Sequence, residues 1–209
     1  LPAKNVYKTQ KEFPAGWIAL RFLKDPATAT QHFARIAERS DNPTALARAG
    51  YWLGRAAEAS GRNMDARAAY QSAAAHSTSY YGQLARARLG LPQIEINRAP
   101  GSGLRGIERF EIVRAVQLLY ALNERDLAIP ILADMGDNAE ADVLAGLAEA
   151  ASRNNDARGM LLLGKAALNR GLPFDIYAFP STGLPHYRPI GPEVDPSVVF
   201  AIARQESGF

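Results

Sequence analysis

The sequence contains no cysteine, and this absence excludes disulfide bonds, cysteine-ligated zinc and thiol catalysis. Such a chain suits either the cytosol or an oxidising compartment. No apolar run approaches the roughly 18 residues that a membrane-spanning helix needs. The opening stretch, LPAKNVYKTQKEFPAG, also lacks the apolar segment of a signal peptide. Because the chain opens without methionine, we expect it to be a processed or excised piece of a longer protein.

Several patterns that carry chemistry are missing as well. The three histidines, His32, His76 and His186, are far apart and lack the spacing of metal ligands. There is no Walker loop and no serine in a nucleophile elbow. The sequence also lacks a basic run with interleaved aromatic residues, which argues against nucleic-acid binding. We therefore expect no metal, no cofactor and no nucleic-acid partner.

Signals for β-structure are scarce, whereas helix formers are abundant. Alternating runs of Val, Ile and Thr are nearly absent, and Ala is very common, accompanied by Leu, Arg and Glu. With 209 residues, 47% of them apolar and 22% charged, the chain has the composition of a globular protein of one or two domains. The net charge of +3 comes from scattered Arg and Lys, so a solvated surface explains it more simply than an acidic polymer partner. We predict an all-α fold.

Helical periodicity and boundary residues organise residues 1–90, the first predicted segment. Asp25-Pro26 and Asn42-Pro43 are helix-start signals, and Gly61 and Gly90 are helix-end signals. The expected helices cover residues 15–23, 27–39, 44–60, 63–75 and 79–89.

Residues 43–78 have the spacing of small and large residues that is typical of a tetratricopeptide (TPR) helix hairpin. Small residues such as Gly54 would let the two helices approach closely, and Tyr70 would fill the groove between them. The early aromatic of the pattern is displaced, because Gly50 occupies its place and an aromatic pair follows. Two interpretations stay open: a TPR-like hairpin and an ordinary Ala-rich helix pair.

Residues 91–106 interrupt the helices and are rich in Pro, Gly and Asn. Within them, GSGLRG formally matches the dinucleotide-binding pattern G-x-G-x-x-G just before a helix. A following strand with an acidic residue at its end is missing, so we predict a linker instead of a nucleotide site.

Residues 107–171 are predicted to continue the helical array. The expected helices cover residues 107–122, 124–134 with a kink at Pro130, 139–153 and 156–170. Residues 172–195 are proline-rich and too long for an idle connection in a compact domain, so we predict a second linker there.

The last segment, residues 196–209, is an apolar helix that carries a carboxylate near its end. Asp195-Pro196 is its start signal, and its expected buried face consists of Val198, Val199, Phe200, Ile202 and Ala203. Glu206 shares a face with part of this set, so we expect partial desolvation, which favours a protonated carboxyl and suits a general acid. The pattern alone still favours a charged residue at the water line, because charged residues commonly end buried helices.

The run AIARQESGF resembles the opening catalytic helix of soluble lytic transglycosylases, enzymes of the goose-type lysozyme-like superfamily that cleave bacterial peptidoglycan. The family pattern is an apolar helix ending in A-R-Q-E-S, then a small residue and an aromatic, and Ala203 to Phe209 fill every position. GWIALRFLKDP, YWLGRAAEASG and HSTSYYGQLARARLG resemble the family's helical superhelix, and PSTGLPHYRPIG resembles its proline-rich lead-in. The resemblance implies a right-handed α-superhelix of antiparallel helix hairpins, a linker and the first helix of a lysozyme-like domain.

The resemblance also implies that Glu206 is the single catalytic acid/base. It would protonate the glycosidic oxygen between N-acetylmuramic acid and N-acetylglucosamine, and then help the muramoyl C6 hydroxyl attack its own anomeric carbon, leaving a 1,6-anhydro sugar. Ser207 and Gln205 are candidate supporting residues. The implied partners are peptidoglycan glycan strands in a bacterial periplasm; other cell-wall enzymes and a peripheral membrane association stay open.

The rest of the family's catalytic domain, including its G-L-M-Q-type motif and groove residues, would lie downstream of Phe209. One helix cannot build a catalytic cleft, so we expect the 209-residue chain alone to be inactive and to be mostly the enzyme's scaffold. The alternative is a non-catalytic helical-repeat scaffold that binds a protein partner or glycan strands.

Overall fold

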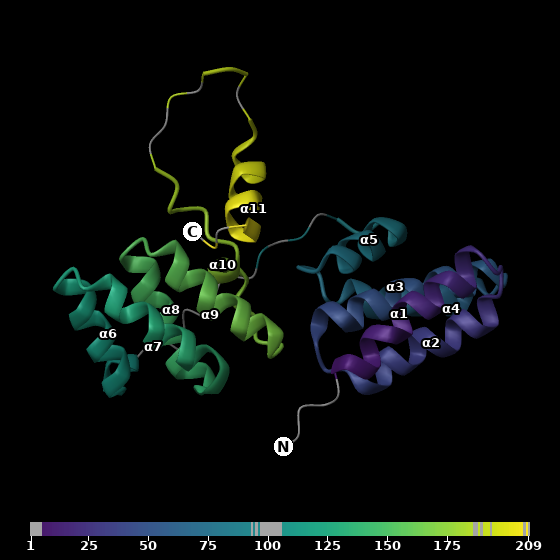
Figure 1. Cartoon of the computed structure of the whole chain (residues 1–209), viewed down its shortest axis with the longest axis horizontal. Coiled ribbons are helices and arrows are strands. Elements are labelled where there is room, and N and C mark those ends of the chain that lie inside the picture. Colours follow the sequence, from purple (N-terminus) through teal and green to yellow (C-terminus); the bar gives the residue numbers. More distant parts are fainter. Residues whose placement is uncertain are drawn as a thin grey trace. The chain divides into compact units, whose positions relative to one another are not determined.

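The fold is all-helical and divides into two compact units. The computed structural model describes residues 6–92, 94, 96, 106–185, 188, 190–192, 194–206 and 208, of which 6–10 are described by their backbone. Every regular element of these residues is a helix, which confirms the predicted all-α class. The units are Leu1–Glu95 (unit 1) and Ile96–Phe209 (unit 2), and each is described by itself (Figure 1). None of the described helices is long and apolar enough to cross a bilayer.

Unit 1 is a series of helices in which each packs against the next along the chain, while α3 also contacts α5. The helices are α1 (Val6–Arg21), α2 (Pro26–Arg39), α3 (Pro43–Ala59), α4 (Asn63–Ala74) and α5 (Tyr80–Leu89).

Short polar side chains start these helices where the sequence predicts them to start. The Asp25 carboxylate accepts a hydrogen bond from the Thr28 N–H at 3.0 Å, and Pro26 occupies the first turn of α2. Asn42 caps α3 in the same way, accepting from the Ala45 N–H at 3.1 Å. Both caps satisfy an N–H group that has no partner within its helix. The two predicted start signals are therefore confirmed.

Helices α3 and α4 approach closely because glycine lies at their contact. A Cβ atom added at Gly54 would lie 2.5 Å from the ring of Tyr70, so the ring occupies the space that a side chain would need. At Gly50, an added Cβ would lie 3.2 Å from the Ala69 carbonyl oxygen. The close packing expected of Gly54 and Tyr70 is confirmed.

A row of aromatic rings connects the helices of unit 1. Phe33 on α2 is fully buried, and its ring centre lies 6.1 Å from that of Phe13 on α1 and 6.0 Å from that of Trp52 on α3. Tyr51 lies 5.8 Å from Trp52 and 5.5 Å from Tyr81 on α5. Ring pairs at these distances add to the stability that burial provides, so the row ties α1, α2, α3 and α5 together.

Unit 2 has its own core, which helices α6 to α10 form together. Its elements are η1 (Ile107–Arg109), α6 (Glu111–Ala121), α7 (Arg125–Asn138), α8 (Ala141–Arg153), α9 (Ala157–Asn169), α10 (Asp175–Ala178) and α11 (Pro196–Glu206). Helix α9 packs against α7, α8 and α10. The largest fully buried apolar side chains of this core are Val113, Val116, Leu132, Leu144, Leu147 and Leu163.

The predicted start of the first helix at residue 15 is wrong, because α1 begins at Val6 and passes through Pro14. Proline in a helix interior removes one backbone hydrogen bond, which is why the sequence favours a later start. The residues just before Pro14 compensate through tertiary contacts. Phe13 packs against the buried cluster of α2 and α3, and Glu12 bonds to α2. Contacts between helices thus override the local proline signal.

Two predicted helices of unit 2 also differ from the structure. The helix expected over 107–122 is divided into η1 and α6 by Phe110, whose backbone is extended. Ile107 is buried in front of this break and packs near Gly146 of α8. The helix expected to end at residue 134 continues through Pro130 to Asn138.

The predicted linker over 172–195 begins inside the core of unit 2. Phe174, Tyr177 and Ala178 are buried, and the short helix α10 packs against α9. Gly164 of α9 makes this contact close, since an added Cβ would lie 2.5 Å from the Cα of Ala178. The predicted linker over 91–106 falls mostly outside the described residues, and so does GSGLRG apart from Gly106.

Candidate functional site

Helix α11 carries the residues with the most specific sequence pattern. Asp195 caps it: its Oδ1 accepts hydrogen bonds from the Ser197 N–H at 2.8 Å and from the Ser197 hydroxyl at 2.7 Å. The bonds from Ser197 lower the pKa of Asp195 below its ordinary value of 3.8, so the cap is ionised at neutral pH. The helix begins at Pro196, as the Asp195-Pro196 signal predicts.

The apolar face expected to be buried on α11 is at most half-buried. Val199, Phe200 and Ala203 are half-buried, whereas Val198 and Ile202 are exposed. No described residue of α11 is fully buried. The prediction of a buried face is therefore wrong for this chain, because only residues 199, 200, 203 and 204 of α11 are half-buried and the rest of the helix is exposed.

Glu206 lies at the C-terminal end of α11 and is exposed, as is Gln205 before it. The partial desolvation expected for Glu206 is thus not found in this chain, and Ser207 lies outside the described residues. A general acid works best where water is withdrawn from its carboxyl group. Unit 2 alone does not shield the Glu206 carboxyl group from water.

Arg204 is the anchored side chain of the terminal motif. Its Nε donates a hydrogen bond to the Ala178 carbonyl oxygen at 2.7 Å, and its guanidinium carbon lies 4.4 Å from the centre of the Phe179 ring. Lys165 of α9 donates from Nζ to the Arg204 carbonyl oxygen at 3.3 Å. Burial lowers the pKa of Arg204 below its ordinary value, which agrees with a guanidinium partly withdrawn from water. These contacts bind the last turn of α11 to α9, to the last residue of α10 and to Phe179 after it.

Within the part of the chain that the structure describes, no group of three or more His, Asp or Glu side chains is arranged to hold a metal ion. His76 is half-buried, and burial lowers its pKa from the ordinary value of 6.5. His186 lies outside the described residues.

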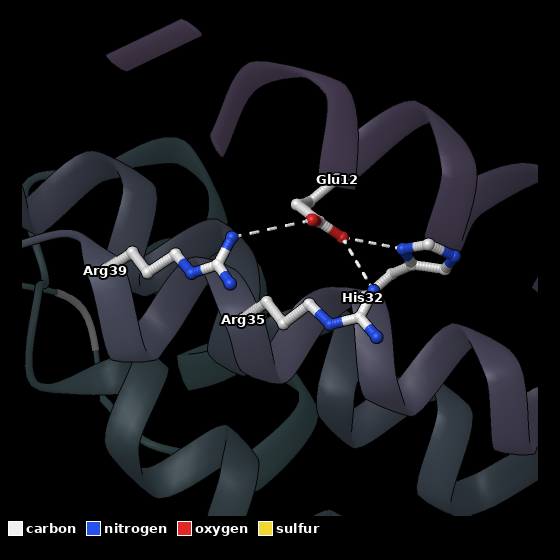
Figure 2. Close-up of polar contacts among 4 residues, drawn as sticks. All are labelled: Glu12, His32, Arg35 and Arg39. Carbon is white, nitrogen blue, oxygen red and sulfur yellow. Dashed lines mark hydrogen bonds and ion pairs between the residues drawn. The ribbon is translucent and has the colours of Figure 1, made fainter. Parts of the chain in front are cut away.

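His32 belongs to a polar cluster between α1 and α2 that the sequence reasoning missed (Figure 2). The Nδ1 of His32 lies 2.6 Å from Oε2 of Glu12, and Nη1 of Arg35 lies 3.5 Å from the same oxygen. Arg39 approaches the other carboxylate oxygen at 3.8 Å. The three basic residues follow the i, i+3 and i+7 positions of one face of α2, and this spacing is the signal that could have found them. The cluster fastens α1 to α2.

We expect Glu12→Gln to lower the free energy of unfolding of unit 1 by about 1 kcal/mol at neutral pH. The bond from His32, with Arg35 nearby, holds the pKa of Glu12 below its ordinary value of 4.5. A lowered carboxylate pKa stabilises the fold above the unfolded-state value, and this contribution is lost as the pH falls through the folded-state value. Wild type and variant should therefore differ at neutral pH and converge in strong acid.

Urea unfolding followed by tryptophan fluorescence measures this difference, because both tryptophans, Trp17 and Trp52, lie in unit 1. Glu38→Gln, an exposed change on α2, is the matched control and should have almost no effect. An equal loss at acidic and neutral pH would contradict the proposed ionic contribution of Glu12.

Asp156 is the centre of a second network that the sequence reasoning missed. Its side chain is 1% exposed and accepts hydrogen bonds from the Gly159 N–H at 3.0 Å and the Tyr120 hydroxyl at 2.7 Å. Nη2 of Arg125 lies 2.7 Å from the same carboxylate. Burial and the bond to Asp156 raise the pKa of Tyr120 far above its ordinary value. These partners come from α6, α7 and α9, so the network serves the fold of unit 2.

A shallow hollow of about 210 Å³ lies beside α5 in unit 1. It is lined by Gln83, Arg86, Ala87, Leu91, Pro92 and Ile94. Ligand sites usually enclose about 300–1,000 Å³. Its size therefore makes this hollow a weak candidate, and α11 is the better one.

No protein-family model, curated protein or solved structure matches the chain significantly.

Proposed function

We propose that this chain is the helical scaffold and first catalytic helix of a peptidoglycan lytic transglycosylase. In this proposal, Glu206 is the acid/base, and Gln205 and Ser207 support it. The substrate is the β-1,4 bond between N-acetylmuramic acid and N-acetylglucosamine in glycan strands.

The proposed reaction uses one carboxyl group twice. Glu206 first donates its proton to the glycosidic oxygen, so the bond from that oxygen to the muramoyl anomeric carbon breaks and N-acetylglucosamine leaves with a hydroxyl group. The resulting carboxylate then accepts the proton of the muramoyl C6 hydroxyl while that oxygen bonds to the anomeric carbon. The product is 1,6-anhydro-N-acetylmuramic acid, no water is consumed and Glu206 is protonated again. The substrate's own hydroxyl replaces the water of ordinary glycoside hydrolysis, so a second catalytic carboxylate is not required.

The observation that carries the proposal is how α11 presents its terminal motif. Arg204 is held against Ala178 and Phe179, while Gln205 and Glu206 face water at the end of the helix. A catalytic carboxylate has to be accessible to a polymeric substrate, and its helix has to be fixed to a rigid support. The arrangement of α11 on unit 2 is consistent with both needs.

We further propose that the helices before α11 belong to a right-handed superhelix of TPR-like antiparallel hairpins, and that α11 is the first helix of a lysozyme-like domain. The tight α3–α4 contact at Gly54 and Tyr70 supports this assignment for one hairpin. In this proposal the concave face of the superhelix binds glycan strands. We place the protein in the bacterial periplasm, where peptidoglycan is found.

Digestion of purified peptidoglycan tests the enzymatic proposal. A longer protein that contains this chain and completes the catalytic domain should release muropeptides with 1,6-anhydromuramoyl ends, identified by mass spectrometry. Its Glu206→Gln variant should release these muropeptides at least about 10²-fold more slowly, since general acid catalysis contributes at least that much. We expect the 209-residue chain to release none, because its Glu206 is solvated. Hydrated reducing ends instead of anhydro ends would contradict the reaction, and full activity of Glu206→Gln would contradict the role of Glu206.

A non-catalytic scaffold is the second candidate, and the exposure of Glu206 on a half-buried helix favours it for the isolated chain. Co-sedimentation of the 209-residue chain with insoluble peptidoglycan tests glycan binding without any need for cleavage. Retention in the pellet that glycan fragments compete away would support docking on glycan strands. A chain that stays in the supernatant would exclude it.

A further inference from the structure

We propose that Arg204 is a positioning residue that sets the direction in which the Glu206 side chain points from α11. It does so through the Arg204 clasp, which we define as its contacts with the Ala178 carbonyl oxygen and the Phe179 ring. The catalytic part of this inference rests on the proposed function. The clasp itself is a property of unit 2 and can be tested without any activity.

Helix α11 depends on docking for its stability. It has 11 residues, and isolated helices shorter than about 12–15 residues are marginal in water. Val199, Phe200 and Ala203 are half-buried and no described residue of α11 is fully buried, so apolar burial holds the helix only in part. The contacts of Arg204 add a directional hydrogen bond and a ring contact to this docking.

The clasp uses features that are particular to arginine. The Nε–H donates a charge-assisted hydrogen bond of 2.7 Å, while the guanidinium carbon lies over the Phe179 ring, 4.4 Å from its centre. Lysine has no planar group that can make both contacts at once. Lys165 adds a third contact by donating to the Arg204 carbonyl oxygen at the C-terminal end of α11, where a cation is favourable.

The residues that receive the clasp are themselves fixed. Ala178 is fully buried, and its backbone lies directly against Gly164 of α9. Pro180, which follows Phe179, is buried as well. The clasp thus joins α11 to the core of unit 2.

Helix geometry converts this anchor into an orientation for Glu206. Residues two apart on an α-helix point in directions that differ by roughly 200° around the axis. When Arg204 is held toward the core of unit 2, Glu206 must point to the opposite side. Arg204 is half-buried and Glu206 is exposed, which agrees with this geometry. Without the clasp, α11 can rotate about its axis or detach, and the direction of Glu206 is no longer defined.

Hydrogen–deuterium exchange of the 209-residue chain tests the clasp directly. Peptides covering residues 198–206 should exchange about tenfold faster or more in Arg204→Ala, because docking protects these amides. Peptides of α9 should keep their protection, which shows that unit 2 remains folded. The matched control is Arg158→Ala, since Arg158 is exposed on α9, and it should exchange like wild type.

Kinetics of the longer enzyme test the positioning role. Arg204→Ala should lower kcat by about tenfold to hundredfold, the usual cost of misplacing a catalytic group, while KM changes little because Arg204 points away from the solvent face. Arg204→Lys should restore only a small part of kcat, since lysine keeps the charge but cannot make the Nε hydrogen bond and the ring contact together.

The outcomes separate the two proposals. Unchanged exchange of residues 198–206 in Arg204→Ala would overturn the clasp, whatever the activity. Faster exchange with unchanged kcat would overturn the positioning role, as would a rise in KM alone. If Glu206→Gln keeps full activity while Arg204→Ala loses protection, the proposed function fails and the clasp stands.

Discussion

Replacing Asp156 by alanine is expected to lower the free energy of unfolding of unit 2 by about 2–4 kcal/mol, because the change removes a helix cap and leaves a buried hydroxyl without its acceptor. The native free energy of a domain is only about 5–15 kcal/mol, so this loss is a large fraction of the total.

Three separate losses contribute to this effect. The Gly159 N–H loses its cap, which costs about 1 kcal/mol. The buried Tyr120 hydroxyl loses its acceptor at 2.7 Å, and an unpaired buried polar group costs about 1–3 kcal/mol. Arg125 loses its ion-pair partner, but it is half exposed and can turn to water, so this loss is the smallest.

Single changes around the network separate these contributions. Asp156→Asn keeps an oxygen for the cap and removes the charge, so it should cost less than Asp156→Ala. Tyr120→Phe should cost about 1 kcal/mol, and the double variant with Asp156→Ala should cost less than the sum of the two. The control is Asp137→Ala, an exposed change on α7 that should have little effect.

Hydrogen–deuterium exchange of α6–α9 measures these losses, since unit 2 contains no tryptophan to report on its unfolding. The fluorescence of Trp17 and Trp52 follows unit 1 at the same time. Unchanged protection of α6–α9 in Asp156→Ala would show that the network does not stabilise unit 2.

Sequence reasoning found the elements whose signals are local. The cap of α2 by Asp25 and the cap of α3 by Asn42 each depend on residues within one turn, and both were predicted. The predicted start of α1 is wrong because Pro14 locally favours a later helix start. The contacts of Phe13 that stabilise the earlier start come from other helices, which the local sequence does not reveal.

The polar networks were missed for the same reason. Glu12 and His32 are 20 residues apart, and Tyr120 and Asp156 are 36 residues apart. Neither pair can be recognised before the packing of the helices is known. The exposure of Glu206 is a related case, because helical periodicity gives the face on which a residue lies but not what covers that face.

Gly164→Ala should separate α10 from α9 and lower the free energy of unfolding of unit 2 by about 1–3 kcal/mol, the usual cost of overpacking. The added Cβ would lie 2.5 Å from the Ala178 Cα and 2.6 Å from the Tyr177 carbonyl carbon, both backbone atoms that cannot turn aside. The change also improves helix propensity by about 1 kcal/mol, so a net loss requires the clash to exceed that gain. Gly50→Ala in unit 1 is a milder comparison and should cost less, because its nearest contacts would be at 3.2 Å instead of 2.5 Å, so a smaller clash opposes the gain in helix propensity.

The same substitution links the core of unit 2 to the proposed site. Gly164 lets α9 and α10 pack closely, and this contact lies among the buried residues Phe174, Tyr177 and Ala178. The Ala178 carbonyl oxygen also accepts the hydrogen bond from Arg204. When α10 moves away from α9, this oxygen moves with it, so the Arg204 clasp should loosen although α11 itself is unchanged. Exchange measurements should therefore show faster exchange at residues 175–178 and at 198–206 together. Protection lost at 175–178 and fully kept at 198–206 would mean that α11 is held by contacts other than the clasp.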